Sequence, residues 1–228
     1  MNKRDRAKNV ASLLINVTIF FLTFFAVGDH FRSDVVPGEH DLLIVHGTEI
    51  FRFFTVQSNI LVAIASVITI VFNIKIAVND SYKIPKWAYL VKYAGTVAVT
   101  VTFLTVVVFL GPLVASGGEY GYFSLFAKHN FILHLVTPVL AIVTFLFLER
   151  TEDFKFRYTV FGALPTVLYS FLYVPMVLTG KWEDFYGFTF GGIMWAVPIS
   201  LVVMYGFPYG LGVAERAISV VMAKKRKN

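Results

Sequence analysis

Six long apolar runs divide the chain, separated by short segments rich in charges and turn-forming residues. The runs cover about residues 10–27, 51–74, 87–110, 131–148, 158–178 and 188–210. A bilayer core of about 30 Å is crossed by an α-helix of about 20 apolar residues. Strands of a membrane β-barrel alternate in polarity over segments of about ten residues, and these runs do not alternate. The pattern predicts an all-α, polytopic membrane protein with a bundle of six transmembrane helices.

The composition supports this prediction. Hydrophobic residues make up 57% of the chain, charged residues only 15%, and the mean hydropathy is +0.71. Soluble domains carry about 25% charged residues, so this chain has too few charges to cover a water-facing surface. The length of 228 residues suits a single transmembrane domain, residues 1–228, rather than two domains.

The positions of lysine and arginine predict the orientation of the bundle. When alternate loops are assigned to the two sides of the membrane, 16 of the 20 basic residues fall on the side that carries both termini. Cytoplasmic loops carry such an excess, so both termini are predicted to be cytoplasmic. The short basic loops suit a bacterial inner membrane. We interpret the basic tail, Lys224-Lys225-Arg226-Lys227, as a contact with anionic lipid and expect no nucleic-acid partner.

The sixth run contains helix-breaking residues near its inner end. Gly206, Pro208 and Gly210 follow one another at a spacing of two, and a proline inside a helix removes a backbone hydrogen bond. We therefore expect a kink or break there, with residues 213–223 lying along the inner membrane surface. None of the six predicted spans contains an aspartate or a glutamate.

Metal and thiol chemistry receive little support. Cysteine is absent, which excludes disulfides, thiol catalysis and cysteine metal sites. His30, His40 and His46 fall in the first outer loop among acidic residues and lack the helical spacing of metal ligands. A solvated loop is the expected account of these histidines, and neither a metal nor another cofactor is predicted.

Two polar clusters interrupt the apolar runs. Thr55, Ser58 and Asn59 have the spacing i, i+3, i+4 and therefore share one face near the start of the second helix. Asn130 and His134 share a face near the start of the fourth helix. Polar groups at membrane depth are costly, so they are candidates for function. Hydroxyl groups in membrane helices also bond back to the backbone or join helices, which remains the alternative reading of the first cluster.

The predicted topology places the two clusters at the same depth. The second and fourth helices both enter the membrane from the outer side, and Thr55 and His134 each lie about one turn past the entry. At 1.5 Å per residue, both lie roughly 6 Å below the outer boundary. A hydroxyl and an imidazole at equal depth are suited to nucleophile–base chemistry, provided that the two helices are neighbours.

Short motifs at these positions resemble those of a known family. Phe53-Phe54-Thr55-Val56-Gln57-Ser58-Asn59 and His134-Leu135-Val136-Thr137-Pro138 are similar to the Phe-x-Thr-x-x-x-Asn/Asp stretch and the helix-borne His followed by Pro of the androgen-induced integral membrane proteins and their bacterial relatives. Leu168-Tyr169-Ser170-Phe171-Leu172-Tyr173 and Thr179-Gly180-Lys181-Trp182 resemble the fifth helix of that family and its Gly-x-Trp turn. The likeness spans most of the chain, in matching order.

The resemblance implies an activity. Vertebrate members are described as threonine hydrolases that cleave fatty acid esters of hydroxy fatty acids, so Thr55 would be the nucleophile and His134 the general base acting on a lipid substrate. An oxyanion donor would also be required. Asn59, Gln57 and Asn130 are the candidate donors. Ser58 is a further candidate for substrate contact, and Tyr169 and Tyr173 would line the cavity.

A non-enzymatic membrane protein is the rival interpretation. A small transporter would favour broken helices at the membrane midplane and an internal repeat, and no repeat is evident. The absence of a carboxylate from the predicted spans counts against a carrier of protons or cations. A lipid-binding protein without turnover is left open.

Overall fold

The computed structural model describes residues 3–31, 47–117, 121–149 and 154–224, and these residues form helices and turns with no strand. Six helices are long and apolar enough to cross a membrane, which confirms the predicted architecture of an integral membrane protein. Their bounds are Lys3–Asp29, Phe54–Val78, Lys86–Ser116, His129–Leu148, Phe156–Leu178 and Val197–Ala223.

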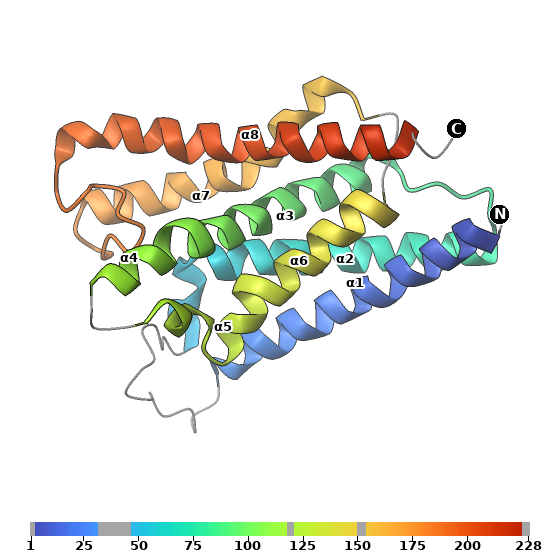
Figure 1. Cartoon of the computed structure of the whole chain (residues 1–228), viewed down its shortest axis with the longest axis horizontal. Helices are drawn as coiled ribbons and strands as arrows, with labels where there is room; N and C mark the ends of the chain where they lie inside the picture. Colours follow the sequence, from blue (N-terminus) through green and yellow to red (C-terminus); the bar gives the residue numbers. More distant parts are fainter. Residues whose placement is uncertain (1–2, 32–46, 118–120, 150–153, 225–228) are drawn as a thin grey trace.

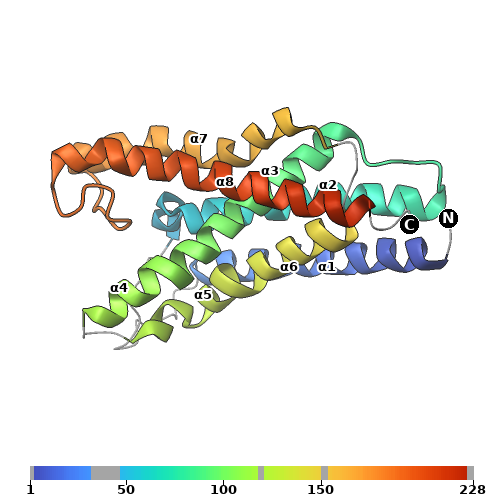
Figure 2. The same ribbon diagram turned by 45° about the horizontal axis from the view of Figure 1, so that its top comes forward.

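The helices pack as a bundle with one central member (Figures 1 and 2). Helix α3 (Lys86–Leu104) contacts α2 (Phe54–Val78), α6 (Thr137–Val143), α7 (Val160–Leu178) and α8 (Val197–Lys224). Helix α1 (Lys3–Asp29) lies against α2, and α7 lies against α8. Both chain ends lie at the same end of the bundle (Figure 1), as an even number of spans requires. Which side of the membrane that end faces remains a prediction from the charges.

Glycines allow the close approach of the neighbours of α3. A Cβ atom added at Gly95 would lie 3.1 Å from the Cα atom of Val62 on α2. A Cβ atom added at Gly212 on α8 would clash with the hydroxyl of Tyr93. Small residues at such positions are typical of membrane helices, because van der Waals packing rather than water exclusion drives their association.

Two spans contain π-helical segments, and in each span one such segment ends two residues before a proline. The third span runs from α3 through η2 (Thr105–Leu110) into α4 (Gly111–Ser116). The fourth runs through α5 (His129–Phe131), η4 (Ile132–Val136), α6 and η5 (Thr144–Leu148). Short 3₁₀ segments lie at η1 (Gly47–Arg52), η3 (Tyr122–Phe126), η6 (Phe156–Thr159) and η7 (Met194–Ala196).

The prolines explain why side chains donate hydrogen bonds to backbone carbonyls within these two spans. In η4 the N–H of Thr137 donates to the carbonyl of Ile132, five residues back. The next bond in this register would join residue 138 to Leu133, but Pro138 has no N–H. The side-chain amide of Asn59 donates to that carbonyl instead, at 3.0 Å.

The third span repeats this arrangement. The N–H of Gly111 donates to Val106, and Pro112 leaves the carbonyl of Val107 without its helical donor. The hydroxyl of Tyr122 donates to it at 2.8 Å. Backbone groups at membrane depth need such partners because no water is there to satisfy them.

The sixth span differs from its prediction. Residues 188–196, which were expected to be helical, form turns and the short η7, and Phe190, Gly191 and Gly192 have positive φ. Helix α8 then continues unbroken from Val197 to Lys224, so the predicted break and the separate surface segment at 213–223 are wrong.

Packing accounts for the continuous helix. Leu211 and Val220 pack against the main core, and Ser219 is fully buried. These contacts hold the chain on the bundle beyond Pro208. The extended helix also brings Glu215 into the sixth span, where it is buried and accepts a hydrogen bond from the hydroxyl of Thr100 at 2.7 Å. The statement that no carboxylate lies within a span is therefore also wrong.

A buried polar network joins four elements toward the end that holds the termini. The ammonium of Lys92 on α3 lies 3.9 Å from the Glu149 carboxylate, which follows η5, and donates to Asn16 on α1 and Ser66 on α2. The amide of Asn16 and the hydroxyl of Ser12 donate to Glu149 at 2.6 and 2.7 Å. Lys92 is 2% exposed. The network ties α1, α2 and α3 to the end of the fourth span.

Removing one charge of this network is expected to destabilise the bundle. Lys92→Met leaves the Glu149 carboxylate buried without its counter-charge, a change that costs about 3–5 kcal/mol for buried pairs. Lys92→Met with Glu149→Gln removes both charges and should be more stable than the single variant. Unfolding in mixed detergent micelles measures both, with Lys86→Met at the exposed start of α3 as the control. Equal stability of Lys92→Met and wild type would contradict the prediction.

The predicted orientation can be tested because the chain has no cysteine. Ser81→Cys introduces a thiol in an exposed turn at the end that holds the termini, and Ser116→Cys introduces one at the exposed end of α4, at the opposite end of the bundle (Figure 1). In intact cells, a membrane-impermeant maleimide should label the Ser116→Cys variant, but it should label the Ser81→Cys variant only after permeabilisation. The reverse pattern would place the termini outside.

Candidate functional site

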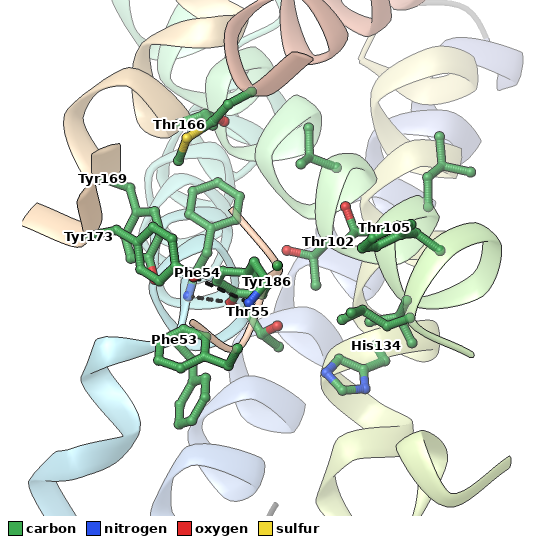
Figure 3. A pocket seen from close by; sticks show the side chains of 18 of the residues that line it. Phe53, Phe54, Thr55, Thr102, Thr105, His134, Thr166, Tyr169, Tyr173 and Tyr186 are labelled. Atoms are coloured by element: carbon green, nitrogen blue, oxygen red, sulfur yellow. Dashed lines mark hydrogen bonds between the residues drawn. The ribbon is translucent and has the colours of Figure 1, made fainter. Parts of the chain in front are cut away.

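An apolar cavity of about 440 Å³ lies at the end of the bundle opposite the termini. The beginning of α2, the outer part of α3, η2, η4, α7, α8 and the segment between α7 and α8 contribute to its wall. Thr55 and His134 both line it, so the structure brings the two sequence clusters to one cavity (Figure 3).

Thr55 is the second residue of α2. The residue before the helix, Phe53, has an extended backbone and provides no side-chain cap. The phenol oxygen of Tyr186 takes this role, because it accepts a hydrogen bond from the N–H of Phe54 at 2.9 Å. The nucleophile candidate therefore lies at a helix start that is capped from another part of the chain, where the first backbone N–H groups have no partner within the helix.

His134 lies in the π-helical segment η4 and is oriented by a backbone carbonyl. Its Nδ1 lies 2.6 Å from the carbonyl oxygen of Leu125 in η3, and the ring of Phe126 meets the imidazole edge-on with a centroid distance of 6.3 Å. A carbonyl only accepts, so Nδ1 carries the proton and Nε2 is left as the acceptor. His134 therefore has the tautomer that a general base requires.

The asparagine of the first cluster, Asn59, uses its side-chain amide to bind backbone carbonyls. Asn59 is fully buried, and its amide donates to the carbonyls of Thr55, at 2.8 Å, and Leu133, at 3.0 Å. An amide has two N–H groups, and both are in use. Asn59 therefore holds α2 against η4 and has no donor left for an oxyanion.

The other candidates of that cluster are also engaged. The hydroxyl of Ser58 lies 3.0 Å from the carbonyl of Thr55 and 2.9 Å from the hydroxyl of Thr102. The amide of Gln57 donates to the carbonyl of Phe51 at 2.7 Å. Neither side chain lines the cavity. The alternative reading of these residues, as groups that join helices, describes Ser58 and Asn59 well.

Asn130, Tyr169 and Tyr173 line the cavity. The hydroxyl of Tyr169 donates to the carbonyl of Arg52 at 2.7 Å, and that of Tyr173 donates to the carboxylate of Asp184 at 2.7 Å. The two rings are stacked with a centroid distance of 5.4 Å. Tyr169 thereby anchors the chain just before Thr55, and Tyr173 anchors the segment between α7 and α8.

Sequence reasoning missed the segment between α7 and α8. Residues 185–190 fold back into the bundle and cover one side of the cavity with Phe185, Tyr186 and Phe188. The predicted sixth run began at residue 188, and that error assigned half of this segment to a helix. The positive-φ positions Gly187 and Phe190 mark its turns, and Gly187 was the signal available in the sequence.

Asp184 holds this segment in place. Its carboxylate accepts hydrogen bonds from the N–H groups of Phe188 and Thr189, at 2.7 and 2.6 Å, and from the hydroxyls of Thr189 and Tyr173. Burial by itself raises the pKa of the Asp184 carboxyl, but these hydrogen bonds outweigh burial and hold the pKa below its ordinary value. The carboxylate is therefore ionised at neutral pH.

The apolar wall of the cavity continues onto the outside of the bundle. Val108 and Phe109 on η2 line the cavity and are 67% and 48% exposed, and Val203 and Phe207 on α8 are 60% and 41% exposed. These side chains of η2 and α8 therefore belong both to the cavity lining and to the apolar outer surface.

The described residues contain no group of three or more histidine or acidic side chains that could hold a metal ion. The expectation of a solvated loop is wrong for His30, which is 6% exposed and lines the cavity, with its ring centroid 3.9 Å from that of His129. His40 and His46 lie outside the described residues.

Comparisons with protein-family models, with curated proteins and with solved structures found no match to this chain.

The anchoring role of Asp184 gives a stability prediction. Asp184→Ala removes the acceptor of four hydrogen bonds, and a loss of about 2 kcal/mol in local stability corresponds to roughly thirtyfold more frequent opening. Trypsin should then cut after the exposed Lys181 correspondingly faster, as followed by mass spectrometry.

Glu183→Ala, at the exposed neighbouring carboxylate, is the matched control and should not change the cleavage rate. Because the pKa of Asp184 is lowered in the folded chain, its contribution is complete at neutral pH. It is lost only as the pH falls below the ordinary pKa of aspartate and through the folded value. Cleavage of Asp184→Ala at the wild-type rate would contradict the anchoring role.

Proposed function

We propose that this protein is an intramembrane hydrolase of lipid esters, with Thr55 as the nucleophile and His134 as the general base. The observation that carries the proposal is that both residues line one apolar cavity, with the imidazole held in the tautomer that leaves Nε2 as an acceptor. The resemblance of the motifs around Thr55 and His134 to those of membrane threonine hydrolases supports the same assignment.

The reaction would proceed through a covalent acyl-enzyme. The Oγ atom of Thr55 attacks the ester carbonyl carbon, and Nε2 of His134 takes the hydroxyl proton. The tetrahedral intermediate then collapses, the bond to the alcohol breaks, and the imidazolium returns the proton to the departing alkoxide. Water, activated by the same imidazole, hydrolyses the acyl-threonine and regenerates the hydroxyl.

The carbonyl of Leu125 takes the part that a carboxylate has in a serine-protease triad. It accepts the Nδ1 proton and fixes the ring, but it carries no formal charge and stabilises the imidazolium less than a carboxylate does. The π-helical backbone around His134 fits this role, since such segments are frequent at functional sites.

The walls of the cavity favour a lipid as the substrate class. Most of the residues that line the cavity are aliphatic or aromatic. Val108 and Val203 line the cavity and also face the outside of the bundle, so an acyl chain would enter beside them from the outer leaflet without contact with water. The basic loops favour a bacterial inner membrane as the location.

A lipid-binding protein or a small transporter is the alternative. The buried Glu215 removes the objection that the spans hold no carboxylate. Its hydrogen bond to Thr100 lies away from the cavity, however, and neither residue lines it. A binding protein would share the cavity but would not form a covalent adduct.

Covalent labelling discriminates between these functions. Purified full-length protein treated with a fluorophosphonate probe should be labelled in the wild type and in Thr55→Ser. It should not be labelled in Thr55→Ala, and His134→Ala should lower the labelling rate by about 10²-fold or more, the usual contribution of a general base.

Thr69→Ala is the matched control, because Thr69 is a buried threonine of the same helix that bonds to its own backbone away from the cavity. It should leave labelling unchanged. Labelling that survives Thr55→Ala would remove Thr55 as the nucleophile. Absence of labelling and of ester turnover in the wild type would favour the binding protein.

A further inference from the structure

The returning segment between α7 and α8 places a phenol beside the nucleophile candidate. The N–H of Tyr186 donates to the hydroxyl of Tyr173 at 3.2 Å, and Tyr173 in turn donates to Asp184. The ring of Tyr186 lies 5.4 Å from that of Tyr173 and 6.4 Å from that of Tyr169, measured between centroids. These contacts fix both the backbone and the ring of Tyr186.

The hydrogen bonds of the Tyr186 hydroxyl determine where its proton points. The oxygen accepts the N–H of Phe54. Its other hydrogen-bonding neighbours are the backbone N–H and the side chain of Thr55 and the side chain of Tyr169. Tyr169 donates its own proton to the carbonyl of Arg52, so it cannot also donate to Tyr186. The proton of Tyr186 is therefore available to the oxygen of Thr55 or that of Tyr169. Figure 3 shows Tyr186 next to Thr55.

The acyl-transfer reaction needs a donor at this place. When Oγ of Thr55 adds to a carbonyl carbon, the developing oxyanion is bonded to the same carbon atom as Oγ. A donor within reach of Oγ is therefore also near the position of the oxyanion. Tyrosine hydroxyls serve as such donors, and they act most strongly in a site that excludes water.

The donors expected from the sequence are mostly unable to take this role. Both N–H groups of Asn59 are donated to backbone carbonyls. Gln57 donates to Phe51, and neither Gln57 nor Ser58 lines the cavity. Asn130 does line it and is the one of these four residues that could serve beside another donor.

We propose that Tyr186 is a catalytic residue whose hydroxyl stabilises the oxyanion formed when Thr55 attacks the ester. This inference rests on the proposed function. It assigns to the segment between α7 and α8 a chemical role in addition to covering the cavity. Burial raises the pKa of the Tyr186 phenol to about 12, which keeps the donor protonated throughout the physiological range.

The test is the hydrolysis of a p-nitrophenyl ester of a medium-chain fatty acid by the full-length protein in detergent. Tyr186→Phe keeps the ring and removes the hydroxyl. We expect kcat to fall by about 10²–10³-fold, the usual effect of losing one oxyanion donor, with little change in KM. A loss of helix capping alone would lower Tm without this change in kcat.

Tyr205→Phe is the matched control. Its hydroxyl lies 2.9 Å from that of Ser170 on the neighbouring helix, and neither residue lines the cavity, so the variant loses a comparable hydrogen bond. Its kcat should equal that of the wild type. A kcat for Tyr186→Phe within about threefold of the Tyr205→Phe value would overturn the assignment.

A second substitution keeps the test decisive if Tyr186→Phe does not fold. Replacing Tyr186 with 3,5-difluorotyrosine preserves the ring and the hydroxyl but lowers the pH at which the phenol ionises. A phenolate cannot donate a hydrogen bond, so this variant should lose activity as the pH rises through a range in which the wild type remains active. Parallel pH profiles for the two proteins would overturn the assignment.

Thr55→Ala in the same assay separates the two proposals. Activity lost in Thr55→Ala but retained in Tyr186→Phe would overturn the role of Tyr186 and leave the hydrolase intact. Activity retained in Thr55→Ala would overturn the proposed nucleophile itself.

Discussion

A lipid bilayer offers no water to unpaired backbone groups, and this constraint shapes the half of the bundle opposite the termini. Pro138 and Pro112 each deprive a carbonyl of its helical donor, and the side chains of Asn59 and Tyr122 replace those donors. The start of α2 has the complementary need for an acceptor, which the hydroxyl of Tyr186 meets. Two of these three contacts lie at the wall of the cavity, because Leu133, Phe54 and Tyr186 line it.

The same constraint separates two kinds of polar group. Toward the end that holds the termini, Lys92 and Glu149 neutralise each other within a shell of amides and hydroxyls, and the network joins elements that are distant in the sequence. At the opposite end the polar groups are fewer and line an apolar space. The polar network stabilises the packing of the helices at one end of the bundle. This stabilisation offsets the packing interactions that are lost around the cavity at the other end.

Much of the fold was predictable from the sequence. The apolar runs defined six helices, because a continuous run of about 20 residues has few alternatives in a membrane. The same reasoning failed at two places. Hydropathy predicted a helix at residues 188–196, which form turns and a short 3₁₀ segment, and it ended the sixth span before residues 213–223, which continue helix α8. In the first segment, Phe188 and Phe190 line the cavity from a series of turns and not from a helix. The second is interrupted by Glu215, which the bundle accepts because Thr100 provides a donor.

The sequence alone determined that Thr55 and His134 lie at one depth, because an even number of crossings brings the second and fourth helices in from the same side. Only the tertiary structure decided that both residues face one cavity, that Leu125 orients the imidazole, and that Asn59 is committed to the backbone. It also decided the position of Tyr186, 131 residues after Thr55 in the chain. Periodicity and hydropathy describe one helix at a time, whereas a site is made by side chains whose mutual positions depend on how the helices pack.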